Sequence, residues 1–180
     1  MTAPDDASAS APRALDAEAI YADLKAAVAA RLAAGGPCPA MVGIHSGGAW
    51  VAERLHADLC PDAPLGFLSS AFHRDDFSAR GLRAAGAGRT HIEFEVEGAS
   101  ILLVDDILYT GRTVRAALNE IFDYGRPARV ELAVLLDRGG RQLPVQADFV
   151  GRTLPLGPDR GFALERGPDG RFSLTVEPAR

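Results

Sequence analysis

The stretch ILLVDDILYTGRT, residues 101–113, contains the features that decide the fold class of this chain. Its continuous apolar run, residues 101–104, is typical of a strand that is buried on both faces of a parallel sheet. Two adjacent aspartates, Asp105 and Asp106, follow at once, and a Thr-Gly-Arg-Thr loop (110–113) comes after them. Two carboxylates at a buried strand end repel one another unless a cation or hydroxyl donors lie beside them. The stretch therefore predicts that a ligand binds beside the two aspartates.

The residues after this stretch predict a helix and a second parallel strand. Apolar side chains recur at helical spacing over residues 112–124, and Gly125 and Pro127 end that pattern. The run VELAVLL, residues 130–136, predicts the next strand. Strand, helix and strand in this order form a βαβ unit with a right-handed crossover.

The remaining segments predict a single α/β domain over residues 14–180, preceded by a disordered tail over residues 1–13 that is rich in Ala, Ser, Pro and Asp. We expect helices over residues 16–34 and 49–59, strands over 40–45 and 65–72, and a C-terminal β-hairpin from 162–166 and 171–176. HIEFEV, residues 91–96, alternates apolar and acidic side chains and predicts a strand with one wet face.

Composition argues against several classes of protein, although a local basic patch stays compatible with it. The net charge of −5 argues against a dominant nucleic-acid surface. No apolar run reaches the roughly 18 residues of a membrane span, so no membrane partner is expected. The two cysteines, Cys38 and Cys60, have no metal-ligand or redox spacing and are expected to be small unpaired thiols. A cytoplasmic location is predicted from them.

Three predicted loops leave the carboxyl ends of parallel strands: residues 45–48, 105–113 and 137–141. Ligands of open parallel sheets bind at that edge. The loop at 110–113 opens a helix, whose first N–H groups can hold a phosphate, although its threonines could instead only cap the helix. With the two aspartates placed to accept hydrogen bonds from sugar hydroxyls, the ligand indicated is a sugar phosphate.

VDDILYTGRT closely resembles the motif of type I phosphoribosyltransferases, which bind 5-phosphoribosyl 1-pyrophosphate (PRPP). Over residues 16–156 the chain further resembles the pyrimidine operon regulators that also have uracil phosphoribosyltransferase activity. The resemblance implies a type I phosphoribosyltransferase fold, with a mostly parallel central sheet flanked by helices, a small hood and an added β-hairpin. The implied reaction joins uracil to PRPP, giving UMP and diphosphate. The implied cofactor is Mg²⁺ carried with PRPP, with no direct protein ligand assured.

Site residues follow from the same resemblance. Asp105 and Asp106 are expected to hold the ribose hydroxyls and to be the catalytic pair. The other PRPP-binding residues are expected to be Tyr109, Thr110, Gly111, Arg112 and Thr113, with His45, Ser46, Gly47 and Gly48 as the pyrophosphate loop. The resemblance implies a hood with Arg74, Asp75 and Asp76, and a uracil border of Leu136, Asp137 and Arg138.

One departure from the family pattern lies in the pyrophosphate loop. Many relatives have Thr-Arg-Gly where this chain has Ser46-Gly47-Gly48, so a positive charge is missing there. The resemblance also implies a homodimer or higher homo-oligomer. Trp50 and Phe122 are expected in the core or a subunit interface. His45 has a second interpretation, as a hydrogen-bonded loop histidine.

Other functions stay open at this point. Arg138, Arg141 and Arg152 are the candidate face for a pyrimidine leader RNA, so one alternative is an RNA-binding attenuation regulator with little catalysis. Another is a purine phosphoribosyltransferase of the same fold. A receiver-like phosphoacceptor would also have an acidic pocket, but it leaves the loop at 110–113 unexplained.

Overall fold

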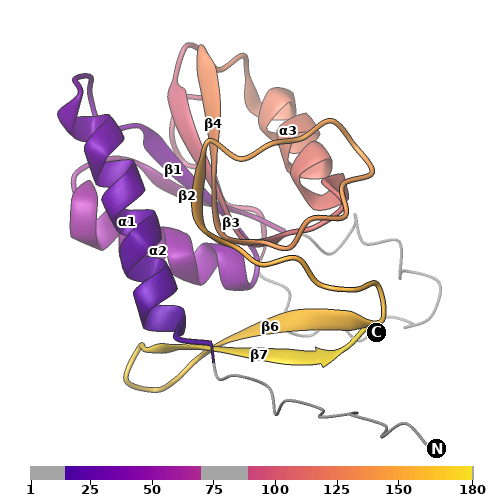
Figure 1. Cartoon of the computed structure of the whole chain (residues 1–180). Coiled ribbons are helices and arrows are strands. Elements are labelled where there is room, and N and C mark those ends of the chain that lie inside the picture. Colours follow the sequence, from indigo (N-terminus) through magenta and orange to yellow (C-terminus); the bar gives the residue numbers. More distant parts are fainter. Residues whose placement is uncertain (1–14, 70–88, 180) are drawn as a thin grey trace, which may run out of the picture.

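A computed structural model describes residues 15–69 and 89–179 (Figure 1). The elements are α1 (Ala17–Ala33), β1 (Ala40–Ile44), α2 (Gly47–Leu59), β2 (Leu65–Leu68), β3 (Ser100–Leu108), α3 (Arg112–Tyr124), β4 (Arg129–Asp137), β5 (Phe149–Thr153), β6 (Arg160–Arg166) and β7 (Phe172–Pro178). The predicted tail, residues 1–13, and the predicted hood residues Arg74, Asp75 and Asp76 lie outside the described residues.

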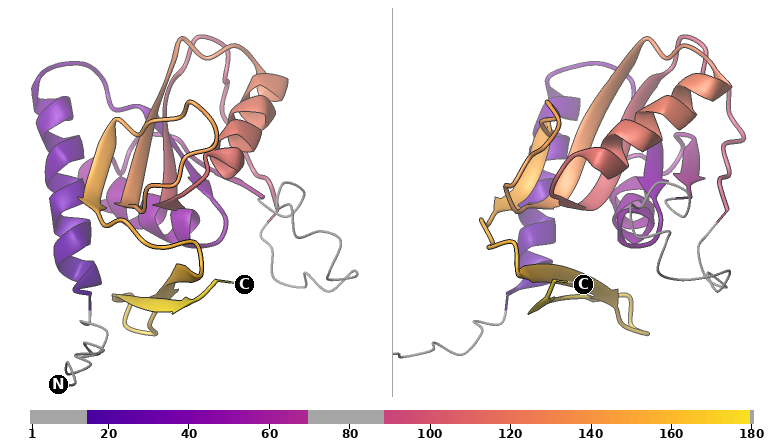
Figure 2. Two further views of the ribbon diagram at one scale, coloured as in Figure 1. Left: turned by 45° about the vertical axis from the view of Figure 1, so that its right-hand side comes forward. Right: turned by 90° about the vertical axis from the view of Figure 1, so that its right-hand side faces the viewer.

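A parallel sheet with strand order β2-β1-β3-β4-β5 forms the centre of the domain. Helices α1 and α2 cover one face of this sheet and α3 covers the other (Figures 1 and 2). Two apolar clusters fill the two interfaces, one under α1 and α2 and one under α3. The central strands β3 and β4 contribute side chains to both clusters, which explains their continuous apolar sequence. The predicted α/β fold with flanking helices is confirmed.

Strand β3 continues beyond its predicted end. It was expected to stop at Val104, but it runs through Asp105 and Asp106 to Leu108. Its pairing with β1 ends at Val104, whereas its pairing with β4 continues to Leu108. Asp105 therefore pairs with Val134 of β4, and both aspartates lie against the loop after β1.

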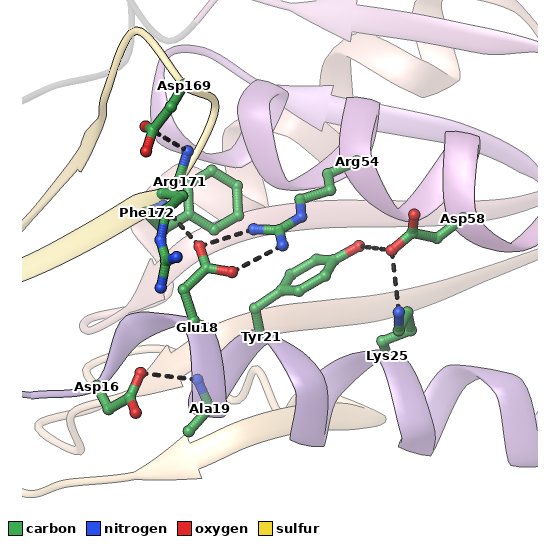
Figure 3. A network of polar contacts seen from close by, with 10 residues as sticks. All are labelled: Asp16, Glu18, Ala19, Tyr21, Lys25, Arg54, Asp58, Asp169, Arg171 and Phe172. Carbon is green, nitrogen blue, oxygen red and sulfur yellow. Dashed lines mark hydrogen bonds and ion pairs between the residues drawn. The ribbon is translucent and has the colours of Figure 1, made fainter.

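The predicted C-terminal hairpin is confirmed as the antiparallel pair β6–β7, which lies beyond one end of the sheet (Figure 1). The backbone N–H of Phe172 donates a hydrogen bond to Glu18 of α1 over 2.7 Å (Figure 3). The same carboxylate accepts two hydrogen bonds from Arg54 of α2, over 2.8 and 2.7 Å. These hydrogen bonds hold the pKa of Glu18 down at about 2. The hairpin is thus fixed to both helices through one carboxylate.

A tyrosine extends this network along α1. The Arg54 guanidinium carbon lies 4.1 Å from the centre of the Tyr21 ring, which meets Phe172 edge-on. The Tyr21 hydroxyl donates to Asp58 over 2.8 Å, and burial together with this carboxylate raises the tyrosine pKa (Figure 3). Burial opposes ionisation of Asp58, but hydrogen bonds from Tyr21 and Lys25 outweigh it and lower the Asp58 pKa.

The expectation of unpaired thiols is wrong, because Cys38 and Cys60 form a disulfide. The chain folds the start of β1 beside the end of α2, with the two Cα atoms 5.9 Å apart. The sequence does not predict this proximity, because the two cysteines are 22 positions apart. In the described ranges no helix is long and apolar enough to cross a membrane.

Two further predictions need correction, and one strand was not predicted. Residues 91–96 keep the alternation, with Val96 buried and the glutamates exposed. They do not form a strand, because His91 is the one residue among these six that makes a β-bridge, to Phe67. Strand β2 ends at Leu68 rather than continuing. Strand β5 was not predicted, because its sequence, FVGRT, has neither a clear alternation nor a continuous apolar run.

Candidate functional site

A cavity of about 370 Å³ opens at the carboxyl edge of the sheet. It is lined by residues from all three predicted loops and from the hairpin: Ile44, His45, Ser46, Gly47, Trp50, Asp105, Asp106, Ile107, Tyr109, Thr113, Arg138, Phe162, Ala163 and Leu164. The prediction that these loops share one rim is confirmed, because β1, β3 and β4 are parallel neighbours.

The acidic pair is held by its own strand and by the loop after β1. Asp105 is buried, and its Oδ1 accepts a hydrogen bond from the backbone N–H of Asp106 over 3.0 Å. Asp106 is only half-buried. Since the two side chains alternate across the strand, they meet different surroundings. Asp105 is a fixed internal acceptor and Asp106 is the more accessible carboxylate.

The predicted pyrophosphate loop packs directly on this pair. A Cβ atom placed on Gly47 would lie 2.2 Å from Oδ2 of Asp106, and one on Gly48 would lie 2.8 Å from the Asp105 Cα. Only glycine fits at either position. The His45–Ser46 peptide is cis, and α2 begins at Gly47. Burial lowers the pKa of His45, and the charge of Glu53 acts in the opposite direction.

The predicted phosphate loop opens α3 as expected. Gly111 stands at the N-cap with a φ of 89°, a left-handed conformation that favours glycine. It offers no side chain to cap the helix, and the Thr110 hydroxyl accepts a hydrogen bond from the Arg112 N–H over 3.3 Å. Thr113 lines the cavity. This helix end can hold an anion through its backbone N–H groups and the positive end of the helix dipole.

Arg138 and Tyr109 form a stacked pair in the wall of the cavity. The Arg138 guanidinium carbon lies 3.9 Å from the centre of the Tyr109 ring. Arg138 is only 7% exposed, and its Nη2 donates to the carbonyls of Gly157 and Arg160. Its Nε is buried with no hydrogen-bond partner among the described residues. A buried donor without a partner calls for an acceptor from water, an ion or a ligand.

The other two residues of the predicted uracil border, Leu136 and Asp137, do not lie in the cavity wall. Leu136 is fully buried in the apolar core and does not line the cavity. Asp137 accepts a hydrogen bond from the Gly139 N–H and pairs with Arg141. Both contacts of Asp137 lie within the loop after β4, so this carboxylate holds that loop in shape.

The three arginines of the candidate RNA face do not form one exposed surface. Arg138 is buried, and Arg141 donates to the backbone carbonyls of Tyr109 and Val145 over 2.8 and 3.0 Å. Arg152 is about half exposed and pairs with Asp23 of α1 over 2.6 Å. Of the three, Arg152 is the most accessible to a large partner.

Sequence reasoning missed the part of the cavity that the hairpin supplies. Phe162, Ala163 and Leu164 of β6 line it, as does Trp50 of α2. Trp50 was expected in the core or an interface, and it is half-buried at the cavity wall. Phe122, which carried the same expectation, is 43% exposed and is not a core residue of this chain. No sequence signal predicts that β6 lies near β3, because tertiary packing brings these two strands to the same cavity.

The Asp106 carboxylate is a side chain that could help to hold a magnesium ion. Among residues 15–69 and 89–179, no group of three or more His, Cys, Asp or Glu side chains could hold a metal. The chemistry of the site fits an ion brought in by phosphate oxygens, since the Asp106 carboxylate is a hard oxygen donor beside a glycine loop.

These features match a known class of protein. The family model described as phosphoribosyl transferase domain matches residues 13–162, so the chain belongs to this family. A hypoxanthine phosphoribosyltransferase from Staphylococcus aureus shares the fold, with a TM-score of 0.60, 23% identity, and coverage of 79% of this chain and 77% of that one.

Within the family, the chain is similar to proteins named Bifunctional protein PyrR. The one from Ralstonia nicotianae is 50% identical over 169 residues, which is 91% of this chain and 95% of the relative. The one from Nitrosococcus oceani is 55% identical over 139 residues, covering 76% of this chain and 77% of the relative. At this identity and coverage the chain belongs with the PyrR proteins.

Proposed function

We propose that this protein is a uracil phosphoribosyltransferase, which converts uracil and PRPP to UMP and diphosphate. The observation that carries the proposal is one cavity in which the acidic pair, the glycine loop after β1 and the start of α3 meet. The family membership and the likeness to bifunctional PyrR proteins support it.

The roles of the loops follow from charge and backbone geometry. The 5-phosphate of PRPP binds at the start of α3, on Thr110, Gly111, Arg112 and Thr113. The ribose hydroxyls donate to Asp105 and Asp106. Breaking the bond from C1 to diphosphate develops positive charge on the ribose, which the buried carboxylate of Asp105 stabilises.

Diphosphate leaves beside His45, Ser46, Gly47 and Gly48. This loop has no Lys or Arg side chain, so its donors are backbone N–H groups together with the Ser46 hydroxyl and a ring N–H of His45. Magnesium, when bound with PRPP, supplies the charge neutralisation that the loop lacks. The remaining work of the protein is positioning and exclusion of water.

Uracil lies against the stacked pair of Tyr109 and Arg138. The buried Nε of Arg138 is a donor that a uracil carbonyl can satisfy. Phe162 and Trp50 add aromatic surface to the same wall. The base therefore meets apolar and aromatic groups with few polar contacts, as is usual for small-molecule sites.

The test is diphosphate release from PRPP with uracil, orotate, guanine and hypoxanthine assayed separately. Release with uracil alone is expected. Release with a purine and not with uracil would establish a purine phosphoribosyltransferase, and no release with any base would leave regulation as the function.

We further propose that the protein regulates pyrimidine genes by binding leader RNA. The likeness to bifunctional PyrR proteins supports this role. The half-exposed Arg152 is the arginine best placed for a phosphate contact. We expect UMP to strengthen retention of a pyrimidine leader transcript on a filter, and Arg152→Gln to weaken it. Equal retention of an unrelated transcript of the same length would contradict specific binding.

We propose self-association of the chain as well. Phe122 and Tyr124, at the end of α3, are 43% and 48% exposed, and these two aromatic side chains offer apolar surface to a second copy of the chain. Light scattering after gel filtration measures the mass in solution, and a monomer would contradict the proposal. A cytoplasmic location stays a prediction, and the Cys38–Cys60 pairing removes the argument from free thiols.

A further inference from the structure

A second cavity, of about 380 Å³, lies between α2 and the turn that joins β6 to β7. It is lined by Trp50, Glu53 and Arg54 of α2 and by Arg166, Asp169, Gly170, Arg171 and Phe172 of the hairpin. The proposed transfer reaction uses none of the hairpin residues that line it. Its volume falls at the lower end of the range for small-molecule sites, roughly 300–1,000 Å³.

Aromatic rings and guanidinium groups alternate around this cavity. The Arg166 guanidinium carbon lies 5.3 Å from the centre of the Trp50 ring, and this arginine also pairs with Glu53. The Arg54 guanidinium carbon lies 5.1 Å from the centre of the Phe172 ring. Planar cations over aromatic rings are a common way to receive a flat base together with a phosphate.

The three arginines differ in how firmly they are held. Arg54 is fixed by two hydrogen bonds to Glu18 (Figure 3). Arg166 has a single, surface-exposed carboxylate partner, which an anion can displace at little cost. The Arg171 side chain has no hydrogen bond or ion pair within the described ranges, although its charge acts on Glu18. Arg166 and Arg171 are therefore the groups available to a ligand.

We propose that this cavity binds a phosphorylated aromatic molecule of mononucleotide size, with its ring on Trp50 and its phosphate between Arg166 and Arg171. A phosphate gives each guanidinium two parallel acceptors, a better partner than the single contact that Glu53 makes. When Arg166 turns from Trp50 toward the phosphate, the aromatic ring of the ligand takes its place over the indole. This binding does not depend on the proposed reaction.

Two groups connect this cavity with the candidate site. Trp50 lines both cavities. Glu53 lines the second cavity, and its charge partly opposes the lowering of the pKa of His45, in the pyrophosphate loop, by burial. When a phosphate takes Arg166 from Glu53, the carboxylate is left uncompensated, and the orientation of Trp50 changes. The ligand therefore alters the affinity for PRPP, and PRPP alters the affinity for the ligand by the same factor. This coupling rests on the proposed function.

The experiment uses the fluorescence of Trp50, which is the only tryptophan of the chain, together with titration calorimetry. The probes are AMP, GMP, adenosine and inorganic phosphate. UMP is left out because it is the proposed product at the other cavity. Either AMP or GMP is expected to change the Trp50 emission and to bind more tightly than adenosine or phosphate alone.

Variants locate the bound nucleotide. Arg166→Gln and Arg171→Gln each remove a charged hydrogen-bond donor and are expected to weaken binding about tenfold or more. Glu53→Gln frees Arg166 and is expected to strengthen it severalfold. Thr113→Val changes the other cavity, so it leaves the nucleotide affinity unchanged. Circular dichroism confirms that each variant is folded.

Some outcomes would overturn the proposal. If neither nucleotide binds, the site does not exist. If Thr113→Val weakens binding and Arg171→Gln does not, the nucleotide occupies the candidate site instead. The coupling is measured as the PRPP dissociation constant with and without saturating nucleotide, and an unchanged constant refutes it. Failure of PRPP to bind at all refutes the proposed function and leaves the nucleotide result standing.

Discussion

Gly47 lies directly against the carboxylate of Asp106, so close that a Cβ atom on the glycine would stand 2.2 Å from Oδ2. This contact joins the start of α2 to the acidic strand β3. At this position a side chain of any size would displace the Asp106 carboxylate.

Gly47→Ala is expected to reduce turnover strongly, because the added methyl group displaces Asp106. Overpacking of this kind costs about 1–3 kcal/mol. Gly161→Ala is the matched control, since a Cβ there meets nothing closer than 3.9 Å. Uracil-dependent diphosphate release and the urea unfolding midpoint are the measurements. Full activity of Gly47→Ala would mean that the contact does not position Asp106.

Asp105→Asn combined with Asp106→Asn is expected to abolish turnover and to preserve the fold. An asparagine oxygen at position 105 can still accept the Asp106 N–H, but neither amide stabilises positive charge on the ribose. Kinetics and circular dichroism test the two halves of the prediction separately. Unchanged uracil turnover would remove the ribose-binding role from the pair.

Arg138→Lys is expected to raise KM for uracil about tenfold, with little change in KM for PRPP. Lysine cannot stack flat on Tyr109 while donating to two carbonyls. Tyr109→Phe keeps the stacked ring and serves as the control, whereas Tyr109→Leu removes it. If KM for PRPP changes instead, Arg138 belongs to the sugar-phosphate end of the cavity.

The Glu18–Arg54 pair is expected to make stability depend on pH. The Glu18 pKa falls from 4.5 to about 2 on folding, so the stabilisation is fully present above pH 4.5 and is lost as the pH falls toward 2. After allowance for solvent screening it is on the order of 2 kcal/mol at pH 7. The free energies of unfolding of the wild type and Glu18→Gln should differ by this amount at pH 7 and converge near pH 2. A difference independent of pH would contradict an ionic origin.

Reduction of the Cys38–Cys60 disulfide is expected to destabilise the protein. The disulfide closes a loop with a sequence separation of 22, which restricts the unfolded chain. Reduction removes this restriction and stabilises the unfolded state by about 3 kcal/mol. Melting with and without a phosphine reductant measures the loss. Cys38→Ala with Cys60→Ala is the control, because reductant should not change its melting temperature. Two titratable thiols in the unreduced protein would show that the pair is not formed.

Much of the fold could be predicted because the patterns are local. The helix at 112–124 has its predicted bounds, since its apolar spacing and Gly125 act within a few residues. The hairpin was recognisable from its turn, Gly167 to Gly170. Strand β5 and the end of β3 could not be predicted, because both depend on pairing with β4.

The sequence by itself determined the chemistry at the strand ends: two carboxylates, a glycine loop and a helix start, all within motifs whose short-range geometry is fixed by residue type. Tertiary structure decided which other groups join them. The stacking of Arg138 on Tyr109, the hairpin wall at Phe162 and the Cys38–Cys60 bond all bring together residues more than 20 positions apart. Such contacts depend on how the layers pack, and packing is a property of the whole chain that no short stretch contains.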